Sequence, residues 1–71
     1  MDEKAALTVL NNMLDTARTD TASLEMRLKS LNEDYAEDPS PDTAAQIERV
    51  AARVTRRRLE AEALAVAVTK F

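Results

Sequence analysis

The stretch LTVLNNMLDTARTDTASLEMRLKSLNEDY, residues 7–35, carries one uninterrupted helical repeat. Its mostly apolar positions lie alternately three and four residues apart, which is the spacing of a seam along one side of an α-helix. The seam positions are Leu7, Leu10, Leu14, Ala17, Thr21, Leu24, Leu28, Leu31 and Tyr35. This spacing predicts a single long helix, and Asp2 is placed to cap its beginning.

A second seam with the same spacing occupies the C-terminal half of the chain. Its positions are Thr43, Ile47, Val50, Val54, Arg57, Ala61, Leu64, Val68 and Phe71. When the chain folds back between the two seams they come into register, so that Leu28 meets Val50 and the ends pair as Tyr35 with Thr43 and Leu7 with Phe71. Even the polar positions coincide, because Thr21 falls opposite Arg57. The shared register predicts an all-α antiparallel two-helix hairpin resembling a coiled coil.

The segment Asp38-Pro39-Ser40-Pro41 separates the seams. A residue before proline avoids the helical region, so Pro39 should end the first helix. Ser40 can cap the second helix, with Pro41 at its first position. We therefore expect one domain over residues 1–71, with helices over about 2–35 and 41–69 joined by a turn over about 36–40.

The composition predicts a thin hydrophobic core. Apolar residues make up 45% of the 71, yet there is one Phe, one Tyr and no Trp, so Ala, Leu and Val must fill the seam. Two helices alone bury little surface, and a chain this small is marginally stable without a staple. We therefore expect a partner protein or a second copy of the chain to complete the core.

Missing residue types argue against several classes of site. The chain contains no Cys, His or Gly, so it lacks disulfides, the usual zinc ligands and glycine-rich phosphate loops. The acidic residues Glu33, Asp34, Glu37 and Asp38 lack the ligand pattern of a calcium loop, and no nucleophile is paired with a base. The sequence therefore predicts no enzyme, no metal site and no cofactor.

The charge distribution favours a hairpin and disfavours nucleic acid as the main partner. The net charge is −3 and the pI is about 4.8. Residues 1–42 carry 4 basic and 10 acidic side chains (net −6), whereas residues 43–71 carry 6 basic and 3 acidic (net +3), so the two helices attract. No signal segment and no apolar run of membrane-spanning length is present, so we expect a cytoplasmic protein.

Arginines crowd the middle of the second helix. Arg49, Arg53 and Arg57 form a like-charged row in which successive members are four positions apart, which disfavours the helix unless acidic groups lie against it. Three sources of acidic groups remain open: the first helix, an acidic partner protein and a nucleic-acid backbone. The candidates on the first helix are Asp20, Glu25, Glu33 and Asp34. The acidic pI and the scarcity of aromatic residues rank nucleic acid third.

Several ion pairs follow from spacing alone. Arg56 with Glu60 and Arg58 with Glu62 are separated by one helical turn and are predicted to pair. Arg57 occupies a seam position, so we predict that its stem lies in the seam and its charged head reaches water. A polar layer that sets the register, or a contact with a partner, is the alternative.

The nearest cross-helix pairs on the flanks of the seam are like-signed. They are Arg27 with Arg53, Asp20 with Glu60, and Arg18 with Arg58. Either side chains reach diagonally, as from Asp20 to Arg53, or some of these charges pair with another chain.

Apolar residues off the seam gather near the two termini. Ala6 and Ala52 flank five residues that we expect to contact a partner: Val9, Met13, Leu59, Ala63 and Val66. Contiguous exposed apolar surface usually marks an interface, although scattered alanines require no such explanation.

A 71-residue chain with two long helices and a short acidic, proline-bearing turn, Glu33-Asp34-Tyr35 through Pro41, resembles the small E-type co-chaperones of bacterial type III secretion. The resemblance covers the whole chain and rests on size and architecture. It implies that the hairpin packs against a helical-repeat co-chaperone, and that together they keep the needle subunit monomeric in the cytoplasm. The alternative is a homodimeric four-helix bundle, similar in shape to small plasmid RNA-binding hairpins, with its arginine row facing RNA.

Overall fold

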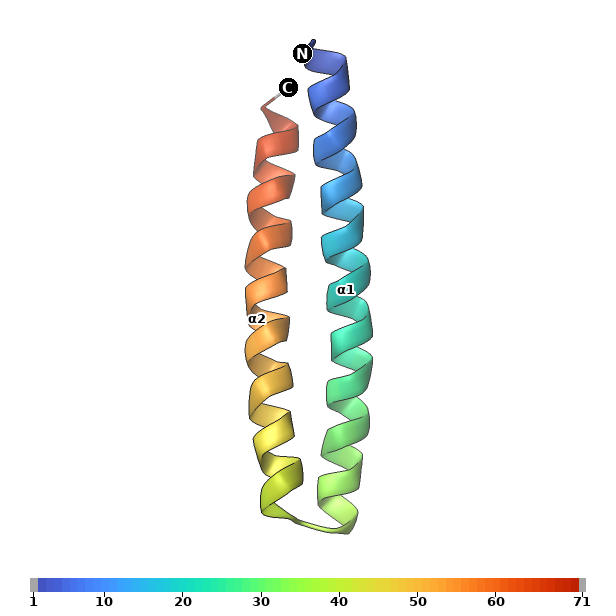
Figure 1. The fold of residues 1–71 in the computed structure, drawn as a ribbon, viewed down its shortest axis with the longest axis vertical. Coiled ribbons are helices and arrows are strands. Elements are labelled where there is room, and N and C mark those ends of the chain that lie inside the picture. The colour runs from blue at the N-terminus through green and yellow to red at the C-terminus, as the bar shows by residue number, and fades with distance from the viewer. Residues whose placement is uncertain (1, 71) are drawn as a thin grey trace.

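The computed structural model describes residues 2–70 as two antiparallel helices that lie side by side (Figure 1). Helix α1 spans Glu3–Glu37 and helix α2 spans Pro41–Thr69. Both termini lie at one end, called here the open end, and the turn lies at the other, the closed end. The all-α hairpin predicted from the two seams is confirmed.

The hairpin is a rod rather than a globule. Its extents are 54 × 16 × 13 Å and its radius of gyration is 16.2 Å. A compact chain of this length would have a radius of gyration of about 11 Å. The elongated shape follows from two long helices with no third element to pack against them.

Local capping explains where the helices begin and end. The Asp2 side chain accepts a hydrogen bond from the Ala5 amide at 2.7 Å, and the Ser40 hydroxyl accepts one from the Thr43 amide at 3.1 Å. These bonds satisfy amides that lack a partner within the helix, so both predicted caps are confirmed. Helix α1 continues two residues beyond the predicted end at residue 35, because Pro39 first constrains Asp38.

The buried core is short and lies along the middle of the seam. Only Leu14, Ala17, Val50 and Val54 are buried among the described residues. Most other seam residues are half-buried, since two helices leave each seam side chain open on its flanks. Tyr35, the seam position of α1 nearest the closed end, is 40% exposed. The predicted layer of Leu7 with Phe71 includes a residue outside the described range.

The difference between the middle and the flanks of the core gives a stability prediction. Replacing Leu14, which is 6% exposed, with Ala should lower the free energy of unfolding by about 2–4 kcal/mol. Leu28→Ala should cost less, because Leu28 is half-buried and its removal leaves a site that water can fill. Urea denaturation followed by circular dichroism measures both. A larger loss for Leu28→Ala would show that something other than α2 covers that flank.

Candidate functional site

Large apolar side chains lie exposed in the half of the hairpin nearer the open end. Val9 and Met13 of α1 are each 50% exposed, and Leu59 and Val66 of α2 are 60% and 55% exposed. Ala63, between the last two, is exposed as well. These five residues are called here the open-end patch. The structure thus leaves exposed every residue that the sequence predicts to contact a partner.

The open-end patch wraps around the hairpin instead of forming one flat face. Leu59, Ala63 and Val66 follow the helical spacing of a single stripe on the outer side of α2. Met13 instead borders a hollow of about 290 Å³ between the helices, whose wall on α2 includes Glu60 and Leu64. A partner that covers the whole patch must therefore contact both the side groove and the back of α2.

Arg57 links the two helices through its charged head. Its guanidinium lies 3.1 Å from the Asp20 carboxylate of α1 and 2.8 Å from that of Glu60, one turn along α2. The Arg57 side chain is 39% exposed, so its stem lies at the seam and its head lies at the rim, as predicted. The head is paired with carboxylates as well as hydrated, which reduces the cost of a charge at a seam position.

Arg58 pairs with the opposite helix, not with its own. Its Nε and Nη2 atoms donate to the Glu25 carboxylate, the Nε bond measuring 3.0 Å. The predicted pairs Arg56–Glu60 and Arg58–Glu62 are therefore wrong, because Arg57 takes Glu60 and Glu25 takes Arg58. Arg57 and Glu60 pair within α2, whereas Arg58 and Glu25 pair across the two helices.

Asp20 reaches diagonally across the flank, but not to Arg53. Its partner is Arg57, so the predicted pair of Asp20 with Arg53 is also wrong. Arg57 is drawn toward α1 because its stem begins at the seam, whereas Arg53 begins on the flank. The first of the three possible sources of acid, the first helix, is thus confirmed for Arg57 alone within the arginine row.

Arg49 and Arg53 have no acidic partner within residues 2–70. The Arg49 Nε donates to the Ala45 carbonyl at 3.4 Å, a contact within its own helix. Both arginines line a hollow of about 390 Å³ together with Arg27 of α1. Arg27, Arg49 and Arg53 are called here the basic cluster. Nothing in the sequence distinguished Arg27 as part of this group beyond its like-signed position opposite Arg53.

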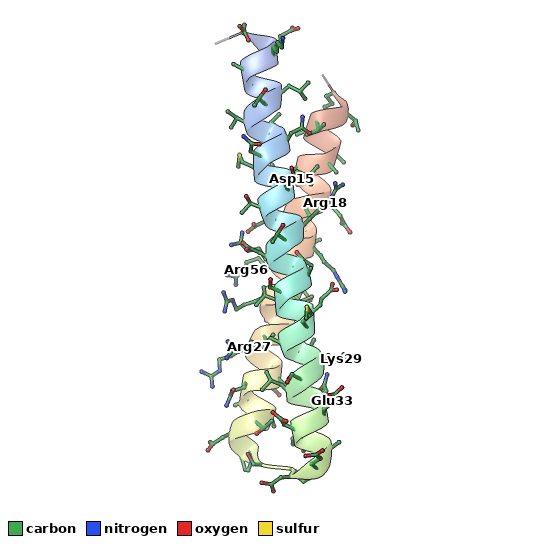
Figure 2. The ribbon with its side chains drawn as sticks, turned by 90° about the vertical axis from the view of Figure 1, so that its right-hand side faces the viewer. Asp15, Arg18, Arg27, Lys29, Glu33 and Arg56 are labelled. Atoms are coloured by element: carbon green, nitrogen blue, oxygen red, sulfur yellow. The ribbon has the colours of Figure 1, made fainter. Side chains whose placement is uncertain are left out.

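The two sides of the hairpin differ in charge. Figure 2 shows Arg27 and Arg56 projecting to one side, whereas Arg18, Lys29 and Glu33 lie toward the other. That other side holds a hollow of about 660 Å³, where Lys29 and Arg58 are balanced by Glu25 and Glu33. Its walls also include small side chains such as Ala51.

Neither metal coordination nor membrane insertion is suggested by the described part of the chain. Within it, no three Asp or Glu side chains group closely enough to hold a metal ion. Neither α1 nor α2 has an apolar stretch that would suffice to cross a membrane. Comparisons with protein families, with curated proteins and with solved structures found no match.

The position of Arg57 in the seam leads to a prediction about stability. Arg57→Leu should leave the free energy of unfolding unchanged or raise it, because an apolar layer replaces a half-exposed ion pair. Asp20→Asn should lower it by no more than about 1 kcal/mol, as is usual for exposed pairs. Urea denaturation at several protein concentrations separates folding from self-association. A loss well above 1 kcal/mol for either variant would instead identify Arg57 as the residue that holds the register.

Proposed function

We propose that this chain is a protein-binding adaptor that uses the open-end patch to contact a second helical protein. The observation that carries the proposal is the exposure of four large apolar side chains, from 50% to 60%, in the half of a thin-cored hairpin nearer its open end. Leu59, Ala63 and Val66 form one stripe on α2, and exposed apolar surface of this kind is typical of interaction sites.

The accessible surface of the chain is larger than that of a compact protein of the same mass. The chain exposes 5392 Å², whereas a compact monomer of 7.9 kDa exposes about 4,400 Å². The excess is close to the roughly 800 Å² that each partner buries in a standard protein interface. A partner of ordinary interface size would therefore bring the exposed surface close to that of a compact protein.

The specific role that we propose is that of a co-chaperone for a type III secretion needle subunit. The hairpin would act in the cytoplasm as part of a heteromeric helical complex with a helical-repeat co-chaperone. Apolar surface of the polymerising subunit would stay covered until secretion, which requires binding and release but no chemical step. The whole-chain resemblance in size, helix lengths and acidic turn supports this role.

A homodimeric four-helix bundle that binds RNA is the second candidate. The observation that favours it is the basic cluster, whose guanidinium groups have no carboxylate partner among the described residues. Phosphates could occupy such a site, and binding would then weaken steeply with salt. This candidate requires a stable dimer of the chain alone, whereas the adaptor requires a different protein.

Substitutions in the open-end patch should separate binding from folding. Leu59→Asp and Val66→Asp should each weaken partner binding by about 2 kcal/mol or more, because a carboxylate would be buried in an apolar interface. Helicity should change little, since both residues are exposed on α2. Met26→Asp is the matched control, because Met26 is 74% exposed on α1 outside the patch.

The measurement is affinity purification of the tagged chain from its native lysate, followed by mass spectrometry. We expect a helical-repeat protein and a small polymerising subunit with the wild type and with Met26→Asp, but not with the two patch variants. Recovery of the bait alone as a dimer would contradict the co-chaperone role. Equal recovery of the partners by all variants would contradict the role of the patch.

A further inference from the structure

Three hollows follow one another along one side of the hairpin. The first, at the open end, is bordered by Met13, Arg57 and Glu60, and the second shares Arg57 and Glu60 and adds Arg53. The third shares Arg53 and extends to Arg27, in the half of the rod nearer the turn. Neighbouring hollows share these side chains, so the three hollows form a row along one side of the hairpin, called here the groove.

The groove changes character along its length. Toward the open end its wall is apolar at Met13 and Leu64. In its middle the Asp20–Arg57–Glu60 network balances its own charges. Toward the closed end it is basic, with Arg27, Arg49 and Arg53 surrounding Gln46 and the buried Val50.

The basic cluster does not stabilise the isolated chain. Arg49 and Arg53 lie one helical turn apart, an arrangement that disfavours a helix when the charges are alike. The nearby carboxylates of Asp20, Glu60 and Glu25 are already bound to Arg57 and Arg58. Three guanidinium groups thus face a surface hollow without a counter-charge, in a chain whose net charge is −3.

The chemistry of the cluster selects an acidic polypeptide. Guanidinium groups bind carboxylates and phosphates through paired, charge-assisted hydrogen bonds. No aromatic side chain lines the hollow to stack a base. Arg49, Arg53 and Arg56 advance along α2 with the spacing at which carboxylates recur on one side of a second helix.

We infer that this groove docks an amphipathic helix of a partner protein, with apolar side chains at the open end and a row of carboxylates against Arg27, Arg49 and Arg53. The inference rests on the proposed adaptor function, because it names the chemistry of the partner. It adds the basic cluster, which the open-end patch does not contain. It also assigns the apolar end of the bound helix to the open end of the hairpin and its acidic end to the closed end.

The test uses the full chain and two labelled synthetic helices of about 25 residues. The first peptide carries leucines near one terminus and four glutamates near the opposite terminus, all on the same face of the helix. Its twin has glutamine in place of each glutamate. Fluorescence anisotropy should show the glutamate peptide binding at least roughly tenfold more tightly than its twin at low salt. The difference should shrink at high salt, because exposed charges are screened.

Two double variants locate the effect. Arg49→Glu with Arg53→Glu should abolish the preference for glutamate. Arg18→Glu with Lys29→Glu changes the net charge by the same amount on the opposite side of the hairpin and should preserve it. Circular dichroism checks that both variants remain helical.

Three outcomes would overturn the inference. The two peptides could bind equally, both double variants could lose the preference equally, or a short RNA duplex could bind through Arg49 and Arg53 while the glutamate peptide does not. The adaptor function would survive the first outcome if Leu59→Asp still abolished copurification of the partner. If the two peptides bound equally and Leu59→Asp did not abolish copurification of the partner, the adaptor function would be overturned as well.

Discussion

The packing of two heptad seams along a single line is the constraint on which the rest of this structure depends. Each seam can face only one neighbour, so the register brings Leu14, Ala17, Val50 and Val54 into the middle of the rod and leaves the flanks open. The ends are set by local bonds at Asp2 and Ser40. The two helices therefore pair in one register, but few of their side chains are fully buried.

The partial burial of the seam side chains is consistent with the proposed binding role. A third helix laid along one flank would cover seam side chains that α1 and α2 only half bury. The groove offers such a position, because its hollows lie along one side from Met13 to Arg27. A partner helix bound there would add to the stability of the hairpin.

The arginines of α2 divide into two groups according to where their stems begin. Arg57 begins at the seam and Arg58 beside it, so both reach carboxylates of α1. Arg49 and Arg53 point to the flank, where α1 presents Arg27 in place of an acid. The arginines of α2 thus divide into two that pair with α1 and two whose charge is available to a partner.

The sequence by itself determined the hairpin, both helix caps and the exposure of Leu59 and Val66, because these follow from periodicity and from contacts between residues close in the chain. Only the tertiary structure decided which charges pair and where the hollows lie. Long arginine side chains span more than one position on the facing helix, so their partners depend on how the two helices are rotated and offset. The tertiary structure likewise decided the 40% exposure of Tyr35, because the seam spacing alone does not say how much of an end position is covered.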